Sequence, residues 1–494
     1  MSAPEASGPP IAQVSSGRLR GSWRESTAVF LGVPFAAPPT GLRRFDAPAP
    51  VTSWTGTRDA TEYGPTTDRI AVPDHSMPET VVPGEATLNL NVFAPDFASS
   101  ENAGRPVLVW IHGGGFIVGS PKNLWYEGGS FTRKGIIVVT VDYRLGIDGF
   151  GAIDGAPDNR GVRDWIAALE WVRDNIGAFG GDPDRVTVAG QSAGGGAVLT
   201  LLGTPAAQHL FRAAIALSGA LGDGSRAKSL RFTADLAHET GVEPNRAGLS
   251  RVPEHDLLKA QMEIVAARRG RDRFAAARDL FRGVLPIAPI VDGELLPMST
   301  PEALSAGVGA DKPLLLVTTD DENAQEASRW LPAAADLLPR GFVLRRTGLS
   351  RAASREFRRA HPGLRPRRLL GRLVADLTFR VLALEVAAAR GEGRTWLARL
   401  KWPSPTFGQA LHCLDLPFFF DILDEPSAAS WLGADPPKEI AEALHGAAVH
   451  IILGEQPAWQ AWDSRAGAIA VLDRSVEIEA DAYHDVRYLG RRLT

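Results

Sequence analysis

The stretch that decides the fold prediction runs from residue 186 to residue 194 and reads VTVAGQSAG. Its first four residues are apolar or β-branched, which is typical of a short buried strand. The next five form the pattern Gly-x-Ser-x-Gly around Ser192, and an apolar run that favours a helix follows at 197–202. A serine on a sharp turn between a strand and a helix presents its hydroxyl for nucleophilic attack. The pattern therefore marks Ser192 as a candidate nucleophile.

This turn has two other interpretations. It is either a purely structural connection, because glycine and serine are common in turns, or a phosphate-binding loop. A phosphate-binding loop needs Gly-Lys-Ser/Thr or Gly-x-Gly-x-x-Gly, and neither is formed in the segment GQSAGGG at 190–196. The strand before the turn and the helix after it favour the catalytic interpretation.

Strands and helices alternate on both sides of this turn. Short apolar runs predict further strands at Val107–Ile111, Ile136–Val141, Ala213–Leu217 and Leu314–Val317. Residues 164–176 repeat their apolar side chains with the period of a helix. Continuous rather than alternating hydrophobicity is typical of strands buried on both faces. We therefore predict an α/β fold, in which helices cover a mostly parallel central sheet.

A run of three glycines follows the strand predicted at 107–111, in the segment His112-Gly113-Gly114-Gly115-Phe116. Glycine triplets are unfavourable inside strands and helices, but they let backbone N–H groups approach a ligand closely. Ester hydrolysis passes through a tetrahedral oxyanion, which such donors stabilise. A flexible loop is the alternative. The pairing with Gly-x-Ser-x-Gly downstream is typical of the α/β-hydrolase fold and favours an oxyanion hole.

In that fold the nucleophile is followed along the chain by an acid and then by a histidine. Asp320, Asp321 and Glu322 come directly after the strand predicted at 314–317. One of the three is expected to be the acid, and the residue chemistry alone does not say which. The other two are expected to be solvated loop charges.

Five histidines follow the candidate acids, and His412 has the most favourable surroundings. It adjoins the apolar segment Leu414–Phe420, which is suited to anchoring a base above the sheet. His445 and His450 are expected on a surface helix, His361 lies in an arginine-rich segment, and the remaining one is near the C-terminus. We therefore expect His412 to be the base.

Composition sets broader limits. The 494 residues are 44% hydrophobic and 22% charged, with a formal net charge of −4, which gives no reason to expect nucleic acid or an anionic membrane as a partner. Cys413 is the single cysteine, so no intrachain disulfide can form. The first ten residues lack the pattern of a secretion signal, and no apolar run reaches eighteen residues. These features predict a cytoplasmic protein.

Two charge-rich helical segments interrupt the alternation, at about 225–283 and 320–390. We expect both to be insertions in a single domain spanning residues 1–494, where they shape the gorge above the active site. Arginines crowd the second segment from Arg340 to Arg372. Such a run attracts an anionic partner or forms a solvated helical face, and the solvated face is the favoured interpretation.

With these residues placed, the chain resembles the type-B carboxylesterases, a family that includes cholinesterases and bacterial p-nitrobenzyl-type esterases. The resemblance runs from about Gly17 to Trp462, with gaps. The motifs that carry it are, in order, GVPFAAPPTG at 32–41, LNLNV at 88–92, WIHGGGF at 110–116, DYRLG at 142–146, WVRDNI at 171–176, FGGDP at 179–183 and the Ser192 turn.

The resemblance implies roles for particular residues. It implies Glu322 as the acid and His412 as the base, with the oxyanion held by the N–H groups of Gly114, Gly115 and Ala193. It also places Ser218 next to the acid.

The same family pattern implies two structural ion pairs, one between Arg44 and Glu85 and one between Arg144 and Asp164. Phe116, together with parts of 225–330 and residues near Trp330 and Phe418–Phe420, is expected to wall the substrate pocket.

Three residues depart from the family pattern. Gln191 replaces the usual glutamate before the nucleophile, Asn323 replaces the glycine after the acid, and Cys413 replaces the glycine after the histidine. Gln191 removes a charge close to the base. Cys413 is seen in members similar to carbamate-hydrolysing enzymes, and we expect it to be a small buried side chain rather than a nucleophile. None of the three changes removes a candidate catalytic residue.

The sequence thus predicts a serine carboxylesterase that hydrolyses esters of small or aromatic alcohols by acyl transfer, with no metal or organic cofactor. An aryl carbamate or amide hydrolase with the same triad is the alternative, because pocket shape and leaving group decide between these substrates. A non-catalytic scaffold on this fold is disfavoured, since both Ser192 and His412 are present. The expected partner is a small ester. The sequence does not distinguish a monomer from a homodimer.

Overall fold

The computed structural model describes residues 8–69, 81–96, 104–222, 224–281, 287–464 and 467–490. Residues 1–7, where no secretion signal is expected, and residues 282–283, at the end of the first predicted insertion, lie outside these ranges. Within the described part of the chain, no helix is both long and apolar enough to cross a bilayer.

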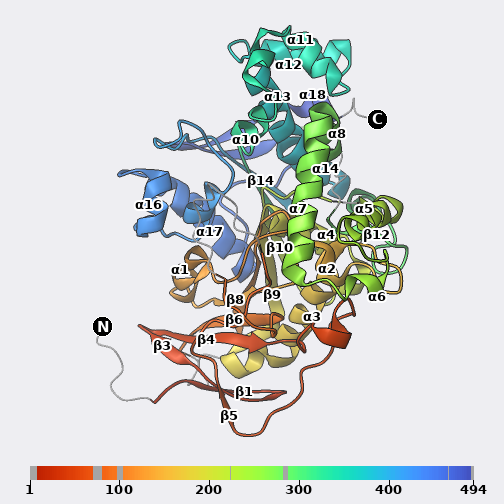
Figure 1. Cartoon of the computed structure of the whole chain (residues 1–494). Helices are drawn as coiled ribbons and strands as arrows, with labels where there is room; N and C mark the ends of the chain where they lie inside the picture. The colour runs from red at the N-terminus through yellow and green to blue at the C-terminus, as the bar shows by residue number, and fades with distance from the viewer. Residues whose placement is uncertain are drawn as a thin grey trace.

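An eleven-stranded sheet forms the centre of the described structure, in the order β16-β15-β14-β13-β10-β9-β7-β8-β6-β4-β3 (Figure 1). The strands from β15 to β8 pair in parallel, and those at the two ends pair antiparallel. The bounds are β3 Ser22–Arg24, β4 Thr27–Pro34, β6 Asn89–Pro95, β7 Arg105–Ile111, β8 Ile137–Val141, β9 Gly181–Gln191, β10 Ala213–Leu217, β13 Leu314–Thr319, β14 Thr395–Leu400, β15 Ala468–Leu472 and β16 Val476–Ala480. All the predicted strands are present. The fold class is therefore the predicted one.

Alternate residues of the parallel strands face two separate cores. In β7, Val107, Val109 and Ile111 join the core that contains α3 Arg160–Asn175 and α4 Ala193–Leu202. Leu108 and Trp110 join the core that contains α15 Asp415–Phe419 and α17 Lys438–Leu453. Burial on both faces explains why these strands read as continuous apolar runs. Because α17 forms part of this second core, His445 is buried rather than on the predicted surface helix, and it contacts Phe419 O at 2.9 Å.

The two charge-rich segments are helical where the structure describes them. The first contains α5 Arg226–Glu239, α6 Arg246–Leu249, α7 Glu254–Arg271 and α8 Arg273–Phe281. The second contains α10 Ala324–Ser328, α11 Arg340–Arg346, α12 Arg351–Ala360, α13 Pro366–Ala375, a π-helical turn at Asp376–Arg380 and α14 Val381–Arg390. In Figure 1, α11 and α12 lie at the opposite end of the molecule from β1 Ile11–Val14 and β5 Thr57–Asp59.

The remaining helices and strands are short. A small sheet has the order β1-β2-β5, with β2 at Gly17–Arg20, and β11 Gly224–Ser225 pairs with β12 Ile290–Val291. The other helices are α1 Gly129–Thr132, α2 Gly146–Phe150, α9 Thr300–Ser305, α16 Pro426–Leu432 and α18 Arg487–Gly490, with 3₁₀ turns at Gly41–Arg43, Leu124–Tyr126, Ile176–Phe179, Pro205–Ala207 and Ala333–Leu337.

One of the two predicted ion pairs is present and the other is replaced. Arg144 makes a two-pronged contact with Asp164, at 2.6 and 2.9 Å, and both side chains are buried. Arg44 does not pair with Glu85. Its guanidinium lies against the buried Asp148 carboxylate at 2.7 and 3.1 Å, whereas Glu85 is exposed. A buried carboxylate needs a cation more than an exposed one does, which explains the different partner.

We expect Asp164→Ala to destabilise the protein by about 3–5 kcal/mol, because it leaves the Arg144 charge buried without a partner. A matched control is Glu294→Ala. Glu294 is 82% exposed and pairs with Arg163 at 3.4 Å, so its loss should cost less than about 1 kcal/mol. Urea denaturation followed by tryptophan fluorescence measures both free energies of unfolding. If both substitutions lowered the free energy of unfolding equally, burial would add nothing to the stabilisation by the Arg144–Asp164 pair.

Candidate active site

The candidate residues all follow the carboxyl ends of adjacent parallel strands. Gly114 follows β7, Ser192 follows β9, Ser218 follows β10, Glu322 follows β13 and His412 follows β14. These five strands are consecutive neighbours in the sheet. The carboxyl ends of parallel strands meet along one edge, which is where open α/β sheets carry their ligand sites.

Ser192 occupies a tight turn that its neighbours make possible. Its backbone has φ 59° and ψ −122°, a combination that is rare for a residue with a side chain. Its N–H donates to Leu217 O at 2.9 Å, which ties the turn to β10. A Cβ on Gly194 would lie 2.0 Å from Ile111 O, so only glycine fits there. Ser192 is partly exposed although both of its chain neighbours are buried.

The glycine loop after β7 lies directly against this turn. A Cβ on Gly113 would lie 3.1 Å from the Cβ of Ser192. Gly114 has φ 115°, and a Cβ there would meet Val118 O at 2.1 Å. Among the described residues, the N–H groups of Gly114 and Gly115 donate to no backbone carbonyl. Ala193 is the first residue of α4, where helical N–H groups also lack an internal acceptor.

Buried aromatic contacts fix the start of the glycine loop. The ring of His112 stacks on Tyr143 with a centroid separation of 4.4 Å, and the Tyr143 hydroxyl donates to His112 O at 2.8 Å. The two contacts anchor the segment that precedes Gly113. The glycine N–H groups are therefore held by a rigid support rather than by a free loop.

Glu322 and His412 form a direct pair. His412 Nδ1 lies 2.5 Å from Glu322 Oε2, and the backbone N–H of His412 donates to Glu322 O at 3.2 Å. The other carboxylate oxygen, Oε1, accepts from Ser218 Oγ and from the Thr319 N–H, each at 2.8 Å. Ser218 thus lies where the resemblance places it. Both oxygens of the acid have partners, so the carboxylate cannot rotate away from the imidazole.

Gln191 contacts the far side of the imidazole ring, and Cys413 in turn contacts Gln191. Gln191 Nε2 lies 3.4 Å from His412 Nε2, and the Cys413 thiol donates to Gln191 Oε1 at 3.4 Å. Cys413 is buried, as expected for a small packing residue. Burial alone would lower the pKa of His412, but the hydrogen bond and charge of Glu322 outweigh it and raise that pKa above its ordinary value. Gln191, being neutral, adds no charge of its own.

Comparison with known proteins identifies the family. The model of the carboxylesterase family matches residues 8–427. The chain belongs to the carboxylesterase family. A para-nitrobenzyl esterase of Bacillus subtilis is 32% identical, with 97% of each chain aligned. A phenmedipham hydrolase of Pseudarthrobacter oxydans is 31% identical, with 96% of this chain and 97% of the relative aligned.

Solved structures agree with this placement. A para-nitrobenzyl esterase structure matches 97% of this chain and 99% of its own, with a TM-score of 0.83 and 30% identity. The carboxylesterase of Geobacillus stearothermophilus matches the same shares, with a TM-score of 0.82 and 30% identity. The protein therefore has the α/β-hydrolase fold and is a carboxylic ester hydrolase.

Two expectations about the acidic loop of this carboxylesterase were wrong. Asp320 and Asp321 are not solvated loop charges. Asp320 pairs with Arg399 at 2.5 and 3.0 Å, and the pKa of its carboxyl stays below the usual range although burial opposes this. Asp321 accepts from the Ala410 N–H at 3.0 Å and from Arg372 at 3.3 Å. The sheet edge is crowded, so each charge beside Glu322 has a partner.

The predicted pocket wall also differs. Phe116 is 1% exposed, and its ring packs on Phe150 and Trp165 with centroid distances of 4.9 and 6.1 Å. Phe418–Phe420 are likewise buried, in the core beside Trp110. These rings support the site from inside the protein and do not line a surface that a substrate reaches. Phenylalanine is among the residues that are most often fully buried in proteins.

Sequence reasoning missed Asp415, three residues after His412. It is fully buried, and neither of its oxygens makes a hydrogen bond of normal geometry among the described residues. Burial, together with the charge of Glu322, raises the pKa of Asp415 to about 7. A single carboxylate within the apolar run at 414–420 was the signal available in the sequence. In the described ranges, no group of three or more His, Cys, Asp or Glu side chains is arranged to hold a metal ion.

We expect Asp415→Asn to stabilise the protein at pH 8 and to leave its stability unchanged near pH 3.5. The folded-state pKa of about 7 lies above the unfolded value of about 3.9, so ionisation costs the native state free energy as the pH rises through this window. The amide removes that cost. Melting temperatures of wild type and variant between pH 3.5 and 8.5 measure the difference, which should grow up to about pH 7 and then level off. A difference independent of pH would mean that the pKa of Asp415 is the same in the folded and unfolded states.

Proposed function

We propose that Ser192, His412 and Glu322 are the nucleophile, base and acid of a two-step acyl transfer. The observation that carries this proposal is the 2.5 Å contact between His412 Nδ1 and Glu322 Oε2, next to the strained turn at Ser192. Glu322 holds the Nδ1 proton and stabilises the imidazolium that forms during the reaction. The Nε2 atom is then the side of the ring that accepts a proton.

In the proposed reaction, His412 takes the hydroxyl proton as Ser192 Oγ attacks the ester carbonyl. The oxyanion of the tetrahedral intermediate accepts hydrogen bonds from the N–H groups of Gly114, Gly115 and Ala193. The intermediate collapses, the alcohol takes the proton from His412, and an acyl-serine remains. Water then attacks by the same route, releases the acid and restores Ser192.

The proposed substrates are carboxylic esters of small or aromatic alcohols. The para-nitrobenzyl esterase that aligns over 97% of both chains supports this class. An aryl carbamate is the second candidate, supported by the phenmedipham hydrolase that aligns over nearly the same length. The same triad serves both, because the carbonyl is attacked in the same way and the carbamate differs by the nitrogen on its carbonyl carbon.

We also propose a cytoplasmic location and a single domain carrying the helical segments 225–283 and 320–390 as insertions. One cysteine in 494 residues supports the location, because proteins of oxidising compartments commonly carry disulfides. The second segment begins with α10, shortly after the carboxyl end of β13, which supports its role in shaping the entrance to the site.

Ser192→Ala should lower kcat/KM for ester hydrolysis by roughly 10⁴-fold or more while leaving the circular dichroism spectrum unchanged. The assay is a series of p-nitrophenyl esters from C2 to C12, run beside an aryl carbamate and an anilide. The matched control is Ser250→Ala, an exposed serine on another part of the chain, which should retain full activity. Fast turnover of the carbamate would favour the second substrate class. Normal activity of Ser192→Ala would remove the proposed nucleophile.

Glu322→Gln should lower kcat and move the acid limb of the kcat/KM profile to lower pH. The reaction needs neutral His412, and the charge of Glu322 raises the pKa at which that neutral form is lost. Without the charge the imidazole stays neutral to lower pH, although it is less well oriented. Rates between pH 5 and 9 test this, with Asp320→Asn as a nearby control whose carboxylate faces Arg399. An unshifted acid limb would mean that another group titrates there.

A further inference from the structure

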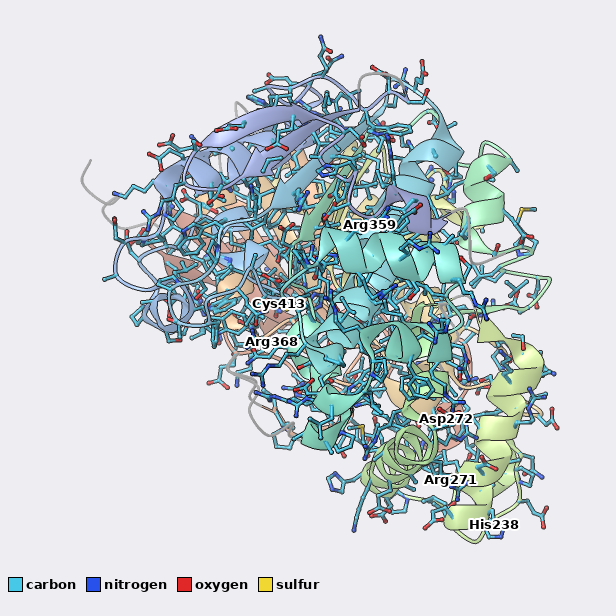
Figure 2. All side chains as sticks on the ribbon, turned by 90° about the horizontal axis from the view of Figure 1, so that it is seen from above. His238, Arg271, Asp272, Arg359, Arg368 and Cys413 are labelled. Atoms are coloured by element: carbon cyan, nitrogen blue, oxygen red, sulfur yellow. The ribbon has the colours of Figure 1, made fainter. Side chains whose placement is uncertain are left out.

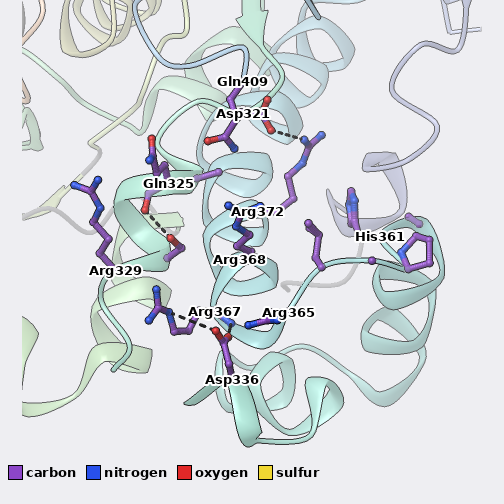
Figure 3. A pocket seen from close by; sticks show the side chains of 16 residues that line it. Asp321, Gln325, Arg329, Asp336, His361, Arg365, Arg367, Arg368, Arg372 and Gln409 are labelled. Carbon is purple, nitrogen blue, oxygen red and sulfur yellow. Dashed lines mark hydrogen bonds and ion pairs between the residues drawn. The ribbon is translucent and has the colours of Figure 1, made fainter. Parts of the chain in front are cut away.

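A cavity of about 800 Å³ lies beside the acid and base loops. Its walls are α10, the turn after α12, α13 and the loop around Gln409 (Figure 3). Its lining contains neither Ser192 nor His412. The cavity is therefore separate from the proposed reaction centre, and the proposed function does not use it.

Five arginines line the cavity, against two aspartates. They are Arg329, Arg365, Arg367, Arg368 and Arg372. Asp321 pairs with Arg372 at one end and Asp336 pairs with Arg367 at the other, as Figure 3 shows. Among the described residues, Arg329, Arg365 and Arg368 form no ion pair, and all three are exposed to solvent at the open side of the cavity. The cavity thus has an excess of positive charge that the protein does not neutralise.

The wall also holds two buried nitrogen atoms that face carboxylates from beyond hydrogen-bond distance. His361 Nε2 lies 3.8 Å from Asp376 and Arg367 Nε lies 4.0 Å from Asp336, and neither has a hydrogen-bond partner in the described structure. Arg340 holds the turn that carries His361, because it donates to the carbonyls of Arg358, His361 and Pro362 at 3.1, 2.5 and 2.9 Å. The turn is therefore fixed, whereas most arginines of the segment, Arg365 and Arg368 included, are exposed, as expected for a solvated face.

The cavity is joined to the acid–base pair through the backbone. Asp321, which lines it, precedes Glu322 and exchanges hydrogen bonds with Ala410 at 2.9 and 3.0 Å. The next pair along is the bridge between Glu322 and Leu411. A ligand that draws Arg372 away from Asp321 therefore acts on the segment that holds Glu322 and His412 in contact.

We propose that this cavity binds an organic anion with two or more carboxylate or phosphate groups. Arginine recognises such groups through paired N–H donors, and three guanidinium groups without internal partners offer several of them. The volume suits a small molecule. The anion is either the acidic end of an ester substrate, in which case this inference rests on the proposed function, or a separate effector.

Citrate is the probe for the binding test, measured by titration calorimetry on the Ser192→Ala protein so that no turnover interferes. We expect one citrate per chain, with an affinity that falls as NaCl is added. Arg365→Gln and Arg368→Gln should each weaken binding roughly tenfold. The matched control is Arg359→Gln on α12, which removes the same charge from an exposed residue outside the lining (Figure 2). The affinity of Arg359→Gln for citrate should stay within about twofold of the unsubstituted value, as expected for a charge outside the site.

Kinetics distinguishes the two sources of the anion. For an acidic substrate, Arg368→Gln raises KM for the p-nitrophenyl monoester of glutaric acid but not for p-nitrophenyl butyrate, and citrate competes only with the acidic ester. For a separate effector, citrate changes the rate for the neutral ester as well. Turnover of p-nitrophenyl butyrate tests the proposed function independently of this site. The proposal would be overturned if citrate did not bind at millimolar concentration, or if Arg368→Gln and Arg359→Gln lost citrate affinity equally.

Discussion

The backbone bridge between Glu322 and Leu411 is the contact on which the reaction centre depends. The two residues lie on loops that leave neighbouring strands, and most of the second helical segment separates them along the chain. The bridge holds these loops in register, so the side chains of Glu322 and His412 meet without further ordering. Pre-ordered geometry of this kind removes an entropic cost from the chemical step. The glycine loop and the Ser192 turn are fixed in the same way, each at the end of its own strand.

Charges behind the acid support this arrangement. Three arginines and four aspartates form one buried or half-buried group, consisting of Arg372, Arg380, Arg399, Asp320, Asp321, Asp376 and Asp485. It holds the segment before Glu322 from one side, while Ser218 and Thr319 hold the carboxylate from the other. Removing one member of such a group leaves its partner buried and charged, which is costly. The local structure around the acid is therefore stiff.

Much of this could be predicted from the sequence, because apolar strands and glycine motifs are local signals. The strands β7, β8, β9, β10 and β13 contain continuous apolar runs, and the patterns around Gly114 and Ser192 fix the turns after β7 and β9. The choice of Glu322 over its neighbours came only from the family resemblance. What could not be predicted are contacts between distant segments. The partner of Arg44, the burial of Asp415 and the cavity beside α13 all depend on how loops far apart in the chain pack together.

The outermost strand β16 has a consequence for the molecule in a crowded solution. Among the described residues it pairs only with β15, and it exposes Val476 and Ile478, which alternate with Glu477 and Glu479. An open strand with apolar side chains is a template on which another chain can add. The two glutamates put like charges opposite each other when two copies approach edge to edge. The sheet is thus protected against growing from one molecule into the next, even though its edge remains uncovered.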